Sequence, residues 1–367
     1  MQIQGIHHIT LVCADAQRTA DFYAGLLAVR LVKKTVNFDA PTTYHLYFGD
    51  DAGTPGMLIT FFEWPDAGKG RSGIGGTHRF ALTVESTNAL IKWKRYLTDH
   101  GVTVEGPYDR TYFHCILLRD PDGCRIEIAT RWPGLAADEP DEALGEAILL
   151  PPPDLTKEGR DEAAIAAQTW PEPVPRVRDE MRLTGLHHIS AISSNMARTA
   201  AFYTNVLGLA IVKKTVNYDA PQIPHWFFGP PDGAPGSLIT YYAYPPGAMR
   251  RAQIGQGQTH HFAFAVSDEG EQEQWRARLV AAGRQVTPIL DRKYFTSIYF
   301  RDPDGHILEI ATIPPGFTVD EPLATLGASL TLPPWLEADR APIAAGLRPL
   351  QPPDAARLAP EAGNGPA

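Results

Sequence analysis

Hydrophobic positions along the chain follow a β-α-β-β-β order. An apolar run lies near the start, and a stretch with apolar residues at helical spacing, among them Phe22 and Tyr23, comes next. Three more runs rich in β-forming residues follow, and turn-forming residues separate the last two. The predicted strands of this first unit cover residues 6–12, 29–36, 44–48 and 57–62.

A second unit repeats that order. Residues 87–100 are predicted to form its helix, and Asp120-Pro121-Asp122-Gly123 is a strong turn signal between its last two strands. The predicted strands of this unit cover residues 79–84, 102–104, 113–118 and 124–129.

The whole two-unit stretch is then repeated. The run Gly5-Ile6-His7-His8-Ile9 returns as Gly185-Leu186-His187-His188-Ile189, and the third and fourth units span residues 186–242 and 259–311. We therefore divide the chain into four segments and expect the last of them to be partly disordered. They are a first copy (1–150), a Pro-rich linker (151–181), a second copy (182–334) and a C-terminal tail (335–367).

Composition narrows the function. The 367 residues are 44% hydrophobic and 20% charged, which is ordinary for a soluble globular protein. The net charge is −9 and the chain has no long basic run, so nucleic-acid and anionic-membrane binding are not expected. No apolar stretch is long enough to span a bilayer. Three cysteines without a CxxC pair do not indicate a disulfide framework, and a cytoplasmic location is expected.

Candidate metal ligands emerge when the units are compared. Histidines recur on predicted first strands, and carboxylates lie inside two apolar last strands. Two imidazoles and one carboxylate can hold non-haem Fe(II) while leaving coordination positions open. The histidines are His8, His188 and His261, and the carboxylates are Glu127 and Glu309.

The second unit has lost part of this set. Arg79 aligns with His261, and an arginine has no lone pair to donate and repels a dication. We therefore place His261 and Glu309 in the working site and Glu127 in a decayed one. The third ligand is His188 if units three and four pair, and His8 if units one and four pair.

Two neighbouring groups depend on strand geometry. Thr10 lies two residues after His8, so both side chains should face the same side of the strand. Tyr299 precedes Glu309 across a hairpin; whether the two share a face depends on the register, and a bulge at Gly305 would allow it. The lysine pairs 33–34 and 213–214 are interpreted as a solvated strand edge, or as contacts to the Asp-Glu-Pro segment that ends each copy (residues 138–140 and 320–322), rather than as catalytic bases.

Four β-α-β-β-β units with a histidine on a first strand and a glutamate on a last strand resemble the vicinal oxygen chelate superfamily. The resemblance implies an α+β fold, in which four βαβββ modules pair into two cup-shaped mixed β-sheet domains around a metal. Four motifs are similar, more narrowly, to those of the hydroquinone-type ring-cleaving dioxygenases. They lie at residues 6–10, 31–37, 44–48 and 326–334.

The subfamily resemblance implies that unit one pairs with unit four, which selects His8 over His188 and leaves His188 facing Arg79 and Glu127 without a metal. The metal would be Fe(II), with Mn(II) as the alternative. The implied ligands are His8, His261 and Glu309, and the implied surrounding catalytic residues are Tyr299, Arg292, His260 and His7, with Thr10 beside them.

The implied function is that of an Fe(II)-dependent, extradiol-type, ring-cleaving dioxygenase. Its substrates would be O₂ and a hydroquinone-like or related diphenolic aromatic. The alternatives are a glyoxalase-like metal-dependent isomerase or lyase, and a metal-free resistance-type protein that binds an aromatic compound or drug. Neither nucleic acid nor a membrane is an expected partner, and exposed sheet edges are compatible with a homo-oligomer.

Overall fold

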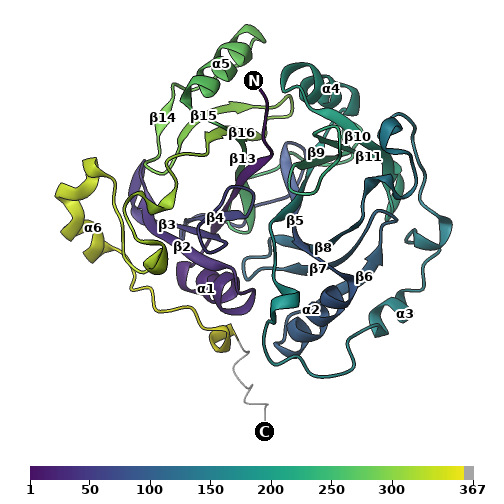
Figure 1. Ribbon diagram of the computed structural model, residues 1–367, viewed down its shortest axis with the longest axis horizontal. Helices are drawn as coiled ribbons and strands as arrows, with labels where there is room; N and C mark the ends of the chain where they lie inside the picture. The colour runs from purple at the N-terminus through teal and green to yellow at the C-terminus, as the bar shows by residue number, and fades with distance from the viewer. Residues whose placement is uncertain (359–367) are drawn as a thin grey trace.

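The computed structural model describes residues 1–358, and their strands form two curled eight-stranded sheets (Figure 1). The first sheet has the order β14-β15-β16-β13-β1-β4-β3-β2. Its strands are β1 (Ile6–Cys13), β2 (Arg30–Asn37), β3 (Ala40–Gly49), β4 (Leu58–Glu63), β13 (Gln258–Val266), β14 (Leu290–Asp291), β15 (Thr296–Arg301) and β16 (Ile307–Thr312).

The second sheet has the matching order β10-β11-β12-β9-β5-β8-β7-β6. Its strands are β5 (Gly76–Val84), β6 (Glu105–Asp109), β7 (Phe113–Arg119), β8 (Arg125–Pro133), β9 (Leu186–Ser193), β10 (Ala210–Asn217), β11 (Ala220–Gly229) and β12 (Leu238–Ala243).

Each sheet combines one unit from each copy. Strand β1 of the first unit pairs antiparallel with β13 of the fourth, and β9 of the third unit pairs antiparallel with β5 of the second. The predicted α+β fold of four paired modules is therefore confirmed. The pairing of unit one with unit four, which the resemblance implied, is the one observed.

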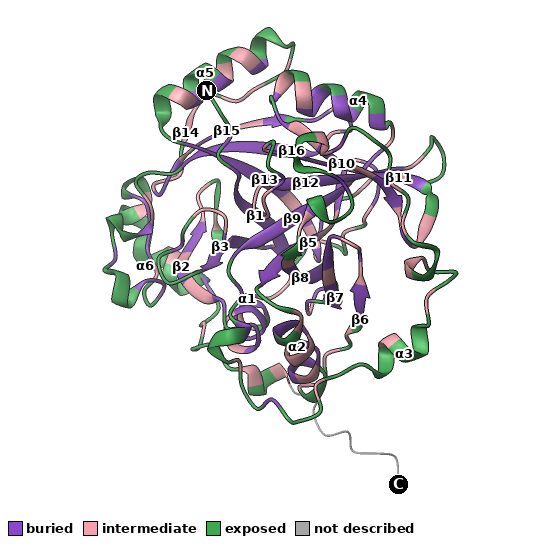
Figure 2. Ribbon diagram, turned by 45° about the vertical axis from the view of Figure 1, so that its right-hand side comes forward, coloured by how far each residue is buried: buried purple, intermediate pink, exposed green. Residues whose placement is uncertain are grey.

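Short helices cover the outside of the sheets, while most strand residues are buried (Figure 2). Ser86 caps the longest helix of the first copy by accepting a hydrogen bond from the backbone N–H of Ala89, and Leu90, Trp93 and Leu97 form its buried face. The helices are α1 (Ala16–Ala20), α2 (Thr87–Asp99), α3 (Glu162–Ala167), α4 (Met196–Ala201), α5 (Glu269–Ala281) and α6 (Arg340–Gly346), and π-helical turns at Asp21–Leu26 and Phe202–Val206 extend α1 and α4. None of these helices is long and apolar enough to cross a membrane.

The strand predicted at residues 102–104 is wrong. The backbone N–H of Val102 donates to the carbonyl of Leu97, so this segment completes the exit from α2 and β6 begins only at Glu105. Gly106 and Pro107 then lie inside β6. A proline is tolerated there because β6 is an edge strand of the sheet.

The Asp-Pro-Asp-Gly turns tie the two sheets together. Asp120 accepts hydrogen bonds from the backbone N–H groups of Asp122 and Cys124 within its own turn. Asp122 then accepts from the backbone N–H of Ala14 and pairs with Arg18 at 2.5 Å, both next to or within α1 of the first unit. Asp304 makes the matching contacts to Ser194 and Arg198, so each copy holds its own two units together across the sheets.

Lys33 is fully buried rather than solvated. Its Nζ atom lies 2.7 Å from Asp320 Oδ1 and 2.5 Å from Glu321 Oε2, in the Asp-Glu-Pro segment that ends the second copy. Lys213 pairs in the same way with Asp138 and Glu139. For these two lysines the solvated-edge interpretation is wrong, and the contact to the segment is the one that the structure contains.

The C-terminal tail returns to the first unit. Tyr44 Oη donates to the carbonyl of Arg348 at 2.8 Å, and Arg357 Nη1 lies 2.9 Å from Asp21 Oδ1. These contacts fix the tail against β3 and the first helical segment as far as Leu358. The expected disorder of the tail also concerned residues 359–367, which lie outside the described residues.

Candidate metal centre

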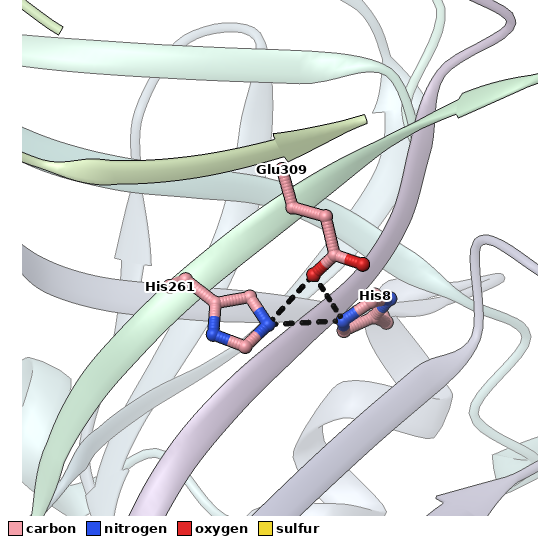
Figure 3. A group of neighbouring side chains, drawn as sticks. All are labelled: His8, His261 and Glu309. Atoms are coloured by element: carbon pink, nitrogen blue, oxygen red, sulfur yellow. Dashed lines mark hydrogen bonds and ion pairs between the residues drawn. The ribbon is translucent and has the colours of Figure 1, made fainter. Parts of the chain in front are cut away.

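Three strands of the first sheet bring His8, His261 and Glu309 together (Figure 3). His8 is on β1, His261 on the neighbouring β13, and Glu309 on β16 beyond it. Glu309 Oε2 lies 3.2 Å from His8 Nε2 and 2.8 Å from His261 Nε2, and the two imidazole nitrogens are 3.2 Å apart. The residues are 2%, 3% and 0% exposed, so the cluster is closed off from bulk solvent.

A neighbouring histidine orients His8. His7 Nε2 lies 3.2 Å from the carbonyl oxygen of Thr312, which can only accept, so His7 carries its proton on Nε2. Burial lowers the pKa of His7 to about 3, and its Nδ1 therefore keeps a lone pair. That atom is 2.9 Å from His8 Nδ1, which must donate. With a proton on Nδ1, His8 has Nε2, which lies 3.2 Å from Glu309 Oε2, as the nitrogen that can bind a cation.

The carboxylate is only half satisfied. Ser297 Oγ donates to Glu309 Oε1, whereas Oε2 faces the two imidazole Nε2 atoms and has no hydrogen-bond partner among the described residues. Burial raises the pKa of Glu309, yet His8 and His261 outweigh it and hold that pKa well below its usual range. A fully buried carboxylate between two imidazoles is costly unless a cation completes the arrangement.

The three donor atoms fit a divalent transition-metal ion. Neighbouring ligands of an octahedral ion at about 2.1 Å are about 3.0 Å apart, and the three separations are 2.8, 3.2 and 3.2 Å. Two neutral imidazoles and one carboxylate also form the donor set typical of non-haem Fe(II). Among the described residues, this is the one group of three or more such side chains that could hold an ion.

A chain of hydrogen bonds leads away from the centre. Thr10 Oγ1 lies 3.0 Å from His261 Nε2 and 2.8 Å from Thr60 Oγ1. His45 Nε2 follows at 3.1 Å from Thr60, and Tyr47 Oη at 3.1 Å from His45 Nδ1. Sequence reasoning identified Thr10 but assigned no role to His45, Thr60 or Tyr47. The signal available for two of them was their alternation on one face of a predicted strand.

An aromatic-walled cavity of about 740 Å³ opens in front of the cluster. Phe62, Trp64 and His260 line it together with His261 and Tyr299. A smaller hollow of about 30 Å³ shares several of these residues and is also lined by His8 and Thr10. The larger cavity therefore leads to the metal-ligand candidates without exposing them.

Tyr299 lies directly opposite Glu309 in the β15–β16 hairpin, and the register is continuous along that pair. Directly opposite residues share a face, so the two side chains face the same side without a bulge at Gly305. The Arg292 guanidinium carbon is 5.5 Å from the centre of the Tyr299 ring, and its Nη1 pairs with Asp39 at 3.1 Å. Burial raises the pKa of Tyr299, so the phenol is protonated near neutral pH.

The two remaining sequence-predicted residues occupy different positions. His260 Nδ1 lies 2.8 Å from His261 Nδ1, and its ring meets Phe62 and Trp64 edge to face in the cavity wall. His7 lies behind His8 and lines neither hollow. Its position suits a residue that orients a ligand rather than one that touches substrate.

The second sheet carries the counterpart of this centre in altered form. Arg79 Nε lies 2.7 Å from Glu127 Oε2, and Arg79 Nη2 donates to Tyr242 Oη at 2.9 Å. His188 faces the guanidinium, whose charge adds to burial in lowering the histidine pKa to about 3. An internal cation thus neutralises Glu127, and no metal is required there.

Buried neutral histidines of the second sheet should make stability depend on pH. Burial lowers the pKa of His187 and of His188 to about 3, whereas an unfolded histidine titrates near 6.5. Below pH 6.5 the unfolded chain binds protons that the native chain does not, so stability falls with pH. Each residue should cost about 2 kcal/mol between pH 6.5 and pH 5.

Urea unfolding of the native chain and of His188→Gln at both pH values measures this loss. A variant with the same pH dependence as the native chain would contradict the prediction.

The sequence matches the Glyoxalase/Bleomycin resistance protein/Dioxygenase superfamily over residues 5–128 and again over 185–310. The chain belongs to this superfamily. Each match covers one copy of the duplicated sequence. The chain therefore carries the superfamily's region twice, and each sheet combines one module from each region.

Relatives within the superfamily span nearly the whole chain. The Bacillus subtilis protein MhqO, provisionally named a ring-cleaving dioxygenase, is 34% identical over 95% of this chain and 96% of its own. Chlorohydroquinone/hydroquinone 1,2-dioxygenase of Sphingobium indicum is 30% identical over 92% and 93%. A Bacillus subtilis crystal structure, provisionally described as a dioxygenase, superposes with a TM-score of 0.76 at 33% identity, covering 96% of this chain and 99% of that one.

Proposed function

We propose that this protein is a metal-dependent ring-cleaving dioxygenase that acts on hydroquinone-like or related diphenolic aromatics. The observation that carries the proposal is the buried convergence of His8, His261 and Glu309 beside an aromatic-walled cavity. Relatives of similar length that bear dioxygenase names support the same reaction class.

The ion held by His8, His261 and Glu309 would be Fe(II), with Mn(II) as the alternative. When bound, it would offer adjacent positions to a phenolic oxygen and to O₂ and a route for electrons between them. In the proposed extradiol-type reaction a ring C–C bond next to a hydroxylated carbon breaks and both atoms of O₂ enter the product. No external reductant is required.

The surrounding residues would manage protons and charge. The hydrogen-bond chain from Thr10 through Thr60 to His45 begins beside His261 Nε2, so Thr10 would be placed to take the phenolic proton from a substrate oxygen bound next to that nitrogen. The positive charge of Arg292, which lines both hollows, would stabilise an anionic oxygen on the ring. The Tyr299 hydroxyl stays protonated and can donate a hydrogen bond to that oxygen.

Oxygen uptake tests the proposal. Protein purified without oxygen and loaded separately with Fe(II) and Mn(II) should consume O₂ with hydroquinone and yield a ring-opened acid, with catechol as the comparison substrate. Turnover of the methylglyoxal–glutathione adduct would instead indicate the isomerase alternative. Protein that retains no metal and consumes no O₂ would indicate a binding protein.

His7 should matter through the ligand that it orients. Replacement by phenylalanine removes the acceptor of the His8 Nδ1 proton and should weaken metal binding about 10- to 100-fold. Competition with a metal-sensitive fluorescent chelator measures the affinity. The matched control is His187→Phe, because His187 holds His188 by the same 2.9 Å contact in the second sheet. Equal affinities in the two variants would contradict the orienting role.

A further inference from the structure

The second sheet keeps a cavity of about 710 Å³ at the position that matches the cavity of the metal centre. A site that had merely decayed would be free to fill with side chains, yet the two volumes are nearly equal. What has changed is the chemistry of the lining. When the two copies are aligned, four residues of the second cavity differ from their counterparts in the first. They are Arg79 in place of His261, Leu117 in place of Tyr299, Tyr242 in place of Phe62, and Arg125 in place of Ile307.

Cations dominate this lining. Arg79 lies deep in the cavity, and Arg119 and Arg125 are exposed residues of its wall, on the paired ends of β7 and β8. Arg119 Nη1 donates to the carbonyl of Gly123 at 3.1 Å, and Arg125 Nη1 lies 2.5 Å from His78, whose pKa burial holds well below its usual value. Neither of these two guanidinium groups has a carboxylate within 4 Å among the described residues.

The acidic residues of the lining are mostly engaged elsewhere. Asp219 pairs with Arg160 at 2.5 Å. Asp120 is buried and accepts hydrogen bonds from Tyr23 and from its own turn, and burial raises its pKa to about 6. Glu105 is exposed on the edge strand. Arg18, the remaining cation, is paired with Asp122. Among the described residues of the lining, two guanidinium groups, those of Arg119 and Arg125, therefore lack an ion-pair partner, and Glu105 is the one exposed carboxylate without one.

Apolar and aromatic side chains form another part of the lining, beside polar residues such as Thr103 and Asn217. Leu117 and Ile126 form part of the wall, and the Tyr242 ring is stacked on His225 at a centroid distance of 3.9 Å. Arg79 Nη2 holds the Tyr242 hydroxyl. A flat apolar body would fit against these groups, whereas a small inorganic anion would leave them exposed to water.

We propose that this second cavity is a metal-independent binding site for aromatic carboxylates. The carboxylate would pair with Arg125 and Arg119, and the ring would lie against Tyr242 and Leu117. A guanidinium binds a carboxylate through two parallel hydrogen bonds, which gives both charge and geometric selection. The site does not depend on the reaction proposed for the first cavity.

Titration calorimetry of metal-free, full-length protein with 1-naphthoate tests the proposal. We expect one binding event per chain, and none with the uncharged 1-naphthalenemethanol. Arg125→Ile introduces the side chain that the first cavity has at the equivalent position, Ile307. It should weaken 1-naphthoate binding about tenfold or more. Leu117→Trp, which narrows the cavity at the wall proposed to hold the ring without altering charge, should weaken it to a similar degree.

A matched substitution separates the two cavities. Val286→Trp places the same bulk in the lining of the first cavity and should leave 1-naphthoate binding unchanged. Thermal unfolding midpoints establish that the variants are folded. Absence of binding to the native chain, or binding that survives in Arg125→Ile and Leu117→Trp but is lost in Val286→Trp, would overturn the proposal. Loss of dioxygenase activity would not affect it, because the titration uses neither metal nor O₂.

Discussion

Replacing His261 with alanine should lower O₂ uptake with hydroquinone by about a thousandfold, which corresponds to about 4 kcal/mol of transition-state stabilisation. The substitution removes one of the three donor atoms and leaves Glu309 Oε2 without its 2.8 Å neighbour. Metal content should fall in parallel. Initial rates of O₂ consumption at pH 7, with metal measured on the same sample, provide the test.

His188→Ala is the matched control, because it removes the equivalent imidazole from the second sheet. We expect it to retain activity close to that of the native chain. Comparable activity in the two variants would contradict the ligand set, as would a loss of activity in His188→Ala that His261→Ala does not share.

Replacing Arg79 with histidine should add a second metal site. The variant would place an imidazole beside His188 and Glu127, in the arrangement that His8, His261 and Glu309 have in the first sheet. It would also remove the cation that now neutralises Glu127 at 2.7 Å. Elemental analysis of metal-loaded protein should rise from about one ion per chain to about two.

Arg79→Gln separates the two effects of that change. It removes the positive charge but offers no imidazole, so it should bind one ion per chain and be less stable, because Glu127 is left buried without a partner. One ion per chain in Arg79→His as well would show that Arg79 is not what excludes metal from the second sheet.

Local sequence alone could not choose between His8 and His188. Both follow a histidine on a buried first strand, and both make the same 2.9 Å Nδ1 contact to it. The difference arises only from long-range pairing, since β1 lies beside β13 whereas β9 lies beside β5. Comparison of units did identify Arg79 as incompatible with a metal, because that inference depends on side-chain chemistry rather than on topology.

Other misses have the same origin in tertiary context. Val102 has high β propensity but uses its N–H to end α2, which the local pattern does not show. A lysine such as Lys33 is expected at the surface. It is buried because Asp320 and Glu321, nearly three hundred residues away in the sequence, pair with its charge. The role of Thr60 depends on its alignment with Thr10 in the parallel β1–β4 pair, a register that periodicity cannot give.

The exchange of units between copies makes the two halves of this chain mutually dependent. The observed donor set is shared between the copies, because His8 comes from one and His261 and Glu309 from the other. A gene fragment encoding only the first or only the second copy would lack half of the strands of each cup. After the duplication, evolution could change the side chains of one cup. It could not remove that cup by deleting one copy, because each copy also supplies strands to the other cup.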